Sequence, residues 1–274
     1  MTTTPTDALR TGDLTPLGRI PTASNATLVC EARSAGDCVR CVYKPVRGER
    51  PLWDFPDGTL AGREFAAYLI SEALDWGVVP ETVLRDGPFG LGMVQRWVDI
   101  VDHDRIDDDS GDDVAPPLGL IDLVPPDRVP GGFRPILRAL APGGDEVVLV
   151  HADDPRLQRM AVLDVILNNA DRKGGHALDG TDGRVYGVDH GICLHVEPKL
   201  RTVLWGWAGE PVPEHLLTDL SDYRTQLDRR HGAELAELLT GAELDALAGR
   251  VDRLLTSRIM PLPPEHRPIP WPAF

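Results

Sequence analysis

The strongest constraint on the fold is a change of hydrophobic pattern along the 274-residue chain. Short β-branched and apolar runs, separated by turn residues, lie at 27–33, 38–44, 82–85 and 91–98. Apolar residues at helical spacing lie at 62–76, 153–167 and 221–257, with one more strand pair at 184–188 and 192–195. We therefore predict an α+β protein with two lobes, a β-rich N-terminal lobe and a mainly helical C-terminal lobe that meet near residues 95–98.

The ends of the chain differ from its middle in composition. Thr, Pro and Asp dominate residues 1–16, which we predict to be a flexible tail, and Pro dominates 261–274, which we predict to be irregular. Between them we place an N-terminal lobe over 17–97 and a C-terminal lobe over 98–260. The acidic stretch at 102–113 is expected to be a solvated loop.

Charge and apolar content exclude several classes of partner. The chain has 28 Lys and Arg against 43 Asp and Glu, a net charge of −15, which opposes unspecific attraction to nucleic acid or to an anionic membrane surface. It lacks an apolar run of the roughly 18 residues that span a bilayer, and its first residues do not form a signal peptide. We predict a cytoplasmic protein with no nucleic-acid partner and no integral membrane association.

Four cysteines are too few for a disulfide framework in a chain of this length. Cys38 and Cys41 are spaced like half of a zinc site. However, they lie in a strand-like run, where side chains three positions apart point to opposite faces, and no second ligand pair follows. A zinc site is therefore not expected.

Four charged residues stand where the predicted elements end or begin. Lys44 ends a strand, Glu64 begins a helix, Asp171 lies in a turn rich in Asn and Gly, and Asp189 follows a strand. Phosphoryl transfer requires a cation on the phosphates, a carboxylate that orients this cation, a carboxylate on magnesium and a group at the acceptor hydroxyl. We assign these roles in the order Lys44, Glu64, Asp189 and Asp171. Taken singly, each residue is equally explained as a surface charge or a turn former.

The segments around these residues resemble those of a known superfamily. NNADRKGGH at 168–176 is similar to the NxDRxxxN catalytic loop of phosphatidylinositol 3-/4-kinases and HipA-related kinases, and VDHGICL at 188–194 to their xDxG metal segment. VYKP at 42–45 with GREFAAYLISEAL at 62–74 resembles the lysine strand and glutamate helix. The resemblance spans about residues 20–240 and includes a bacterial group described only as phosphatidylinositol-kinase-like.

This resemblance implies an atypical protein-kinase-like fold that uses ATP and Mg²⁺ to transfer the γ-phosphate to a hydroxyl acceptor. We rank the acceptor as a small molecule, a lipid headgroup or a protein Ser or Thr, in that order. His176 stands where the family pattern has Asn, so it is the expected second metal ligand beside Asp189, and its softer nitrogen makes Mn²⁺ an alternative. Lys173 is a catalytic candidate that can contact the γ-phosphate. A nucleotide-binding pseudokinase or scaffold, or an AMP transferase with the same pocket, remain alternatives.

The remaining nucleotide contacts are expected in two places. The first hairpin has no GxGxxG run, and Ser24, Asn25 and Thr27 offer polar side chains and backbone N–H groups to phosphates instead. Gln95 and Trp97 lie in the connector between the lobes, where backbone groups meet the adenine in kinases. All five are assigned to nucleotide binding.

Overall fold

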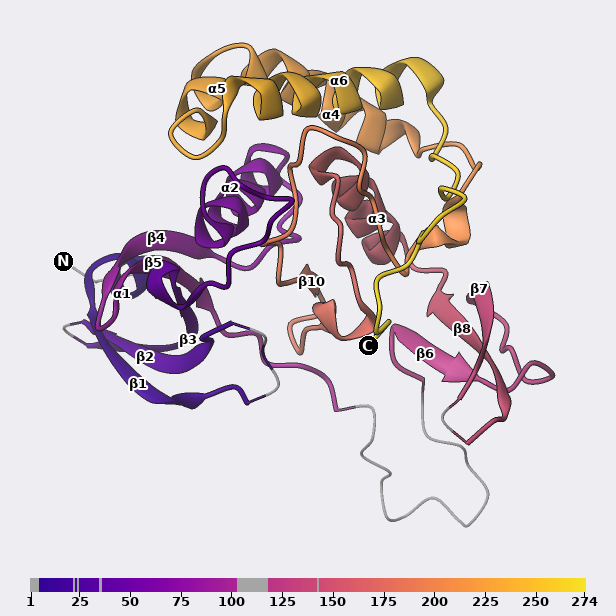
Figure 1. Cartoon of the computed structure of the whole chain (residues 1–274), viewed down its shortest axis with the longest axis horizontal. Helices are drawn as coiled ribbons and strands as arrows, with labels where there is room; N and C mark the ends of the chain where they lie inside the picture. The colour runs from indigo at the N-terminus through magenta and orange to yellow at the C-terminus, as the bar shows by residue number, and fades with distance from the viewer. Residues whose placement is uncertain (1–4, 22, 24, 35, 103–117, 142) are drawn as a thin grey trace.

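The computed structural model describes residues 5–21, 23, 25–34, 36–102, 118–141 and 143–274. Strands dominate its N-terminal part and helices cover its C-terminal part (Figure 1). The predicted α+β class with a β-rich N-terminal part is therefore confirmed. Ser24 and nearly all of the acidic stretch predicted at 102–113 lie outside the described residues.

A five-stranded antiparallel sheet forms the N-terminal part, in the order β1-β2-β3-β5-β4. Its strands are β1 (Asp13–Arg19), β2 (Leu28–Ser34), β3 (Asp37–Pro45), β4 (Thr82–Gly87) and β5 (Gly90–Arg96). The last four match the predicted runs. A short 3₁₀ turn, η1 (Val46–Gly48), follows β3.

The N-terminal segment is part of this sheet and differs from the predicted tail. Helix α1 (Pro5–Thr11) packs on the sheet and buries Ala8 and Leu9 completely against a cluster that includes Cys41 and Tyr43. β1 then pairs with β2 from Asp13 onward. Because the β1 side chains are mostly exposed, the strand is held by backbone hydrogen bonds, which leave no hydrophobic pattern in the sequence.

Helix α2 (Leu60–Ala73) follows the first three strands, as predicted, and contacts β4 and β5. Its first turn is capped twice. The Thr59 hydroxyl accepts from the N–H of Gly62, and the Glu49 carboxylate accepts from the N–H groups of Leu60 and Ala61. These caps fix the end of the helix that carries Glu64.

A second, smaller sheet follows the acidic stretch and was not predicted. β6 (Ile121–Val124), β7 (Phe133–Leu140) and β8 (Glu146–Ala152) form it in the order β6-β8-β7. The pairing of β7 with β8 shifts between Pro135 and Leu137, and β7 buries none of its side chains fully. The strand therefore lacks the period-two alternation on which its prediction would depend.

The C-terminal part is built around α3 (Pro155–Leu167), which matches the pattern predicted at 153–167 and begins after the Asp154 cap with Pro155 in its first turn. The long helical pattern at 221–257 corresponds to α4 (Glu214–Leu227), α5 (Arg230–Leu235) and α6 (Gly241–Ser257). Between them lie η2 (Gly174–His176), β9 (Ala177–Asp179), β10 (Val185–Gly187) and η3 (Trp205–Trp207).

The predicted partner of β10 was wrong. β10 pairs with β9, whereas residues 192–195 form no strand. Cys193 and Leu194 there are fully buried, so their apolar character comes from core packing. Residues 261–274 form neither helix nor strand, and the carbonyl of Ala273 accepts from the N–H of Gly174 at 2.8 Å. No helix in the described part of the chain is long and apolar enough to cross a membrane.

Buried histidines make the fold sensitive to acid. His151 of β8 is fully buried, donates from Nδ1 to the carbonyl of Ala152 and accepts at Nε2 from the N–H of Gly206. Burial lowers the pKa of His151 from 6.5 to about 4, and burial also lowers the pKa of His176, His190 and His231. The folded state thus binds fewer protons than the unfolded state in this range, so acidification from pH 6.5 toward pH 4 costs stability.

We expect His151→Gln to weaken this dependence. The variant lacks one proton acceptor, so the stability lost between pH 7 and pH 5 shrinks by roughly 1–2 kcal/mol. Urea unfolding at the two pH values measures the difference, with the exposed His215→Gln as control. An unchanged difference would show that His151 is not part of the acid response. The pKa of Glu64, raised to about 7, acts in the opposite direction in both proteins.

Candidate functional site

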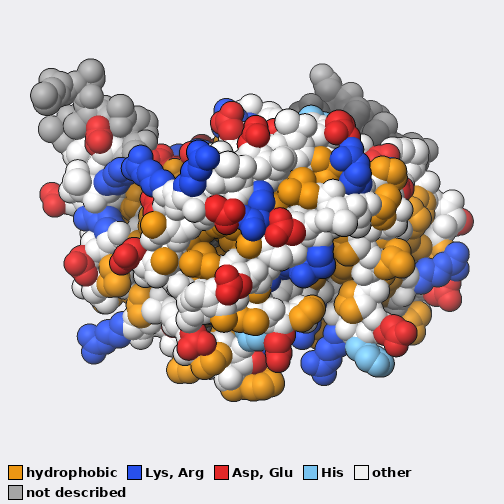
Figure 2. All heavy atoms as spheres, turned by 90° about the horizontal axis from the view of Figure 1, so that it is seen from above, with side chains coloured by type: hydrophobic (Ala, Val, Ile, Leu, Met, Phe, Trp, Pro, Cys, Tyr) orange, Lys and Arg blue, Asp and Glu red, His pale blue; other side chains and the backbone are white. Residues whose placement is uncertain are grey.

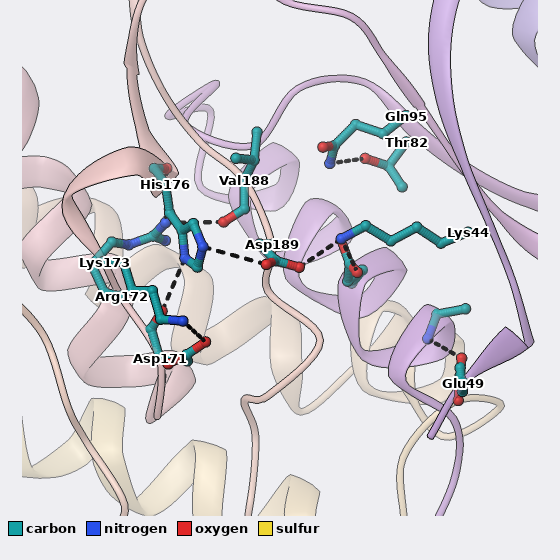
Figure 3. A network of polar contacts seen from close by, with 12 residues as sticks. Lys44, Glu49, Thr82, Gln95, Asp171, Arg172, Lys173, His176, Val188 and Asp189 are labelled. Carbon is teal, nitrogen blue, oxygen red and sulfur yellow. Dashed lines mark hydrogen bonds and ion pairs between the residues drawn. The ribbon is translucent and has the colours of Figure 1, made fainter. Parts of the chain in front are cut away.

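Lys44 connects the two parts of the molecule through its ammonium group (Figure 3). Its Nζ lies 2.8 Å from Oε1 of Glu64 in α2 and 2.6 Å from Oδ1 of Asp189, which follows β10. Lys44 and Asp189 are 145 residues apart in the sequence. The structure therefore brings three of the four ordered charges into direct contact.

The surroundings decide which of these groups carry charge. Burial raises the pKa of Glu64 to about 7, against the opposing effect of Lys44. Burial by itself lowers the pKa of Lys44, but the two carboxylates together hold it above its ordinary value. Lys44 in turn holds the pKa of Asp189 well below its ordinary value. Asp189 therefore keeps an ionised carboxylate. Because its side chain is 49% exposed, solvent and ligands can reach this carboxylate.

The backbone at Asp189 has a left-handed conformation, with φ of 61°. Residues other than Gly adopt this region at a cost of about 1–3 kcal/mol, and such residues cluster at functional sites. Two positions later, a Cβ atom on Gly191 would lie 3.3 Å from the Cβ of Leu60 and 3.5 Å from Oε1 of Glu64. The turn after β10 thus lets the chain pass close to α2 and directs Asp189 toward Lys44.

His176 approaches Asp189 from the other side (Figure 3). Its Nδ1 donates to the carbonyl of Asp171 at 2.9 Å, and its Nε2 lies 3.4 Å from Oδ2 of Asp189. Burial lowers the pKa of His176 to about 4, so the ring is neutral at pH 7. Since Nδ1 carries the proton, the lone pair of Nε2 faces the Asp189 carboxylate. These two electron-pair donors have no proton between them and can share a cation.

Asp171 and Lys173 lie on the same loop, with Lys173 Nζ 3.5 Å from Oδ2 of Asp171. The N–H of Asp171 donates to Oδ1 of Asn169 at 3.0 Å, which fixes the turn. Burial raises the pKa of Asp171. Each side chain is about one-quarter exposed, so both can meet a ligand.

Arg172 anchors the loop 171–176 to the core through its guanidinium. It was not among the predicted site residues. It is fully buried and pairs with Asp164 of α3, Nε to Oδ2, at 2.9 Å. Its Nη1 donates to the carbonyls of His176 and Val188, at 3.0 Å each. The guanidinium of Arg172 is thus directed to Asp164, and its neighbour Asp171 pairs with Lys173. The signal in the sequence was a lone carboxylate, Asp164, in the apolar second half of α3 at 160–167.

The predicted nucleotide contacts are not connected to this network in the described residues. Oδ1 of Asn25 accepts from the N–H of Arg50 at 3.0 Å, and Thr27 is 5% exposed. Gln95 is buried and donates to the Thr82 hydroxyl at 2.9 Å. The N–H of Trp97 donates to the carbonyl of Arg40, whose guanidinium lies 5.5 Å from the centre of the indole ring. The backbone N–H of Trp97 is thus already used within the sheet.

Comparison with known proteins places the chain in a family. No family model matches the sequence. Protein Rv2133c of Mycobacterium tuberculosis (strain ATCC 25618 / H37Rv) is 57% identical over 274 residues, which covers 97% of this chain and 94% of that protein. The chain belongs to the Rv2133c family. At 57% identity the relative shares the fold described above. Its name states no activity.

A solved structure also aligns with this member of the Rv2133c family. It is the crystal structure of a Helicobacter pylori proinflammatory kinase, CtkA, with a TM-score of 0.44 and 12% identity, and it covers 91% of this chain and 93% of that chain. A likeness of this degree is too weak to assign a fold or an activity. Neither comparison tests the resemblance to phosphatidylinositol 3-/4-kinases.

Proposed function

We propose that this chain is an ATP- and divalent-metal-dependent phosphotransferase of the atypical kinase type, resembling phosphatidylinositol 3-/4-kinases. The observation that carries the proposal is the continuous network from Glu64 through Lys44 and Asp189 to His176. It supplies a cation and an exposed carboxylate at one point between the two parts of the molecule. Charges placed in this way are what phosphoryl transfer requires of a protein.

Lys44 and Glu64 have distinct roles in this proposal. Lys44 binds the ATP phosphates and exchanges its contact with Asp189 for phosphate oxygens when the nucleotide enters. Glu64 is buried and stays paired with Lys44, so the ammonium keeps its position during this exchange. The released Asp189 oxygen is then free to bind a cation.

The donor atoms present fit a divalent metal. Among the described residues no group of three or more His, Cys, Asp or Glu side chains converges on one point. Asp189 and His176 would therefore be the two protein ligands, and phosphate oxygens and water complete the shell, as is usual for magnesium in nucleotide enzymes. When bound, the metal neutralises charge on the transferred phosphate. The imidazole nitrogen favours Mn²⁺ over Mg²⁺ more than an amide oxygen does.

Asp171 and Lys173 serve the transfer itself. The raised pKa of Asp171 suits a group that accepts or orients the acceptor hydroxyl proton, and Lys173 can pair with the γ-phosphate. Ser24, Asn25 and Thr27 remain the proposed phosphate-side contacts, with Gln95 and Trp97 proposed at the adenine. We rank the acceptor as a small-molecule hydroxyl before a lipid headgroup or a protein, since a net charge of −15 opposes work at anionic membranes.

The proposal is tested by nucleotide binding and by the mass of the product. ATP with MnCl₂ or MgCl₂ is expected to stabilise the protein by about 2.7 kcal/mol at a hundredfold excess over the dissociation constant. A metabolite mixture incubated with ATP is then searched for a phosphoryl gain by mass spectrometry. An adenylyl gain would indicate AMP transfer, and binding without any consumption of ATP would indicate a scaffold.

We expect His176→Asn to change the metal preference. The amide oxygen is a harder ligand than the imidazole nitrogen, so the ratio of Mg²⁺- to Mn²⁺-supported binding and turnover rises, by about tenfold. Titration of each metal at fixed ATP measures the ratio. The exposed His215→Asn in α4 serves as the matched control. An equal ratio of Mg²⁺- to Mn²⁺-supported binding and turnover in the two variants would show that His176 is not a metal ligand.

A further inference from the structure

A cavity of about 890 Å³ lies apart from the Lys44 network. Its walls come from the end of α3, the stretch 196–201, the last turns of α6 and the irregular segment after it. Much of the lining is apolar and includes Val165, Leu254 and Met260. Its volume is in the range of sites that hold small ligands.

The charges on this cavity have one dominant sign. The cationic and histidine side chains that line it are Lys199, Arg201, Arg250, Arg253, His266 and Arg267. Asp252 is the acidic side chain in the lining, and it already pairs with Arg224 at 2.8 Å, as Lys199 does with Asp54 at 3.2 Å. The face seen in Figure 2 carries basic and acidic side chains side by side. In a chain with a net charge of −15, such a collection of basic groups favours an anionic ligand.

Arg250 gives a second and independent indication. It is 7% exposed, and its guanidinium donates to the carbonyls of Ile166 at 2.7 Å and His195 at 3.1 Å. Its Nη2 has no hydrogen-bond partner, and no carboxylate of the described residues forms an ion pair with it. Burial lowers the pKa of Arg250 to about 10. A buried cation without a counter-ion is costly, and an anion in the neighbouring cavity offsets this cost.

We propose that this cavity is a second ligand site, which binds an anion with an apolar body, such as a phosphate or carboxylate head on a short hydrocarbon chain. Arg253 and Arg267 are exposed, line the cavity and have no ion pair within the described chain, so they meet the head while the field of Arg250 holds it. The hydrocarbon lies along Val165, Leu254 and Met260. The site uses no residue of the proposed phosphotransfer network and stands independently of that function.

The cavity also borders the catalytic loop. Asn168 lines it, ends α3 in a left-handed conformation and donates to the carbonyls of His195 and Glu197 at 3.0 and 2.7 Å. The next residue, Asn169, accepts from the N–H of Arg201 at 2.9 Å. An occupant of the cavity therefore rests against the same backbone that positions Asp171.

The test is isothermal titration calorimetry of the full chain with hexyl phosphate, inorganic phosphate and 1-hexanol. We expect hexyl phosphate to bind, and the double variant Arg253→Gln/Arg267→Gln to weaken this binding about tenfold or more. The double variant Arg19→Gln/Arg138→Gln, at exposed arginines of β1 and β7, is the matched control and should leave it unchanged. Circular dichroism confirms that the double variant is folded.

Each result decides the proposal. Two results together support a site for head and body. The double variant binds hexyl phosphate more weakly than the wild type does, and the wild type binds inorganic phosphate and hexanol more weakly than hexyl phosphate. Equal binding of inorganic phosphate and hexyl phosphate would show a free-phosphate site and overturn the apolar part. Equal affinity of the wild type and the double variant, or no binding of hexyl phosphate to the wild type, would overturn the site.

Discussion

Asp189→Asn is expected to abolish metal-dependent nucleotide binding, whereas Asp171→Asn is expected to keep binding and lose turnover. Asp189 is the exposed carboxylate that contacts both Lys44 and His176, so its neutral amide removes the charge that a divalent cation needs. The Asp171 carboxylate pairs with Lys173 of its own loop, and its loss lowers turnover by about 10²- to 10⁴-fold through the missing proton acceptor. Thermal shift with ATP and metal measures binding, and ATP consumption measures turnover.

The matched control is Asp245→Asn, which removes one exposed carboxylate from α6. It changes the net charge by the same amount as each of the other two variants and should alter neither nucleotide binding nor turnover. If Asp171→Asn abolishes metal-dependent binding and Asp189→Asn loses only turnover, the metal and acceptor roles of the two residues are exchanged. If both behave like the control, the network is structural and the phosphotransferase proposal is wrong.

Part of the candidate site could be singled out from the sequence because Lys44, Glu64 and Asp189 stand at the ends of elements. Lys44 ends a strand, Glu64 lies in the first turn of a helix, and Asp189 follows the short strand β10, so the order of elements carries the order of roles. Local pattern singled out these residues, and the resemblance of their segments to atypical kinases predicted that they meet across 145 residues of sequence. The contacts of Lys44 with both carboxylates agree with that prediction. The chemistry of these contacts stays a proposal.

Other parts could not be predicted because they depend on contacts between distant segments. The segment 5–19 has the composition of a tail, and only its pairing with β2 and the burial of Leu9 make it structure. β7 is too exposed and irregular to show alternation, and β8 is a continuous buried run, which alternation does not detect. Gln95 was assigned to a connector, yet its side chain is bound to Thr82 inside the sheet. In each case the structure of the segment depends on a tertiary contact that the local sequence does not reveal.

Arg172→Leu is expected to destabilise the protein by about 3–5 kcal/mol, measured by urea unfolding. Arg172 and Asp164 are both fully buried, so removal of the guanidinium leaves a buried carboxylate without its counter-charge, although the amide of Asn169 still donates to it at 2.9 Å. The carbonyls of His176 and Val188 lose a donor at the same time. The exposed Arg138→Gln in β7 should change stability by less than about 0.5 kcal/mol.

The double variant Arg172→Leu/Asp164→Leu separates stability from function. An apolar pair can replace a buried ion pair without loss, so part of the stability should return. The donors that join the 171–176 loop to Val188 do not return, and the distance between His176 and Asp189 is then no longer fixed. Recovered stability with metal binding still impaired is therefore the expected result. Full recovery of both would mean that Arg172 serves only to neutralise Asp164, and that the loop and the turn after β10 hold their positions without it.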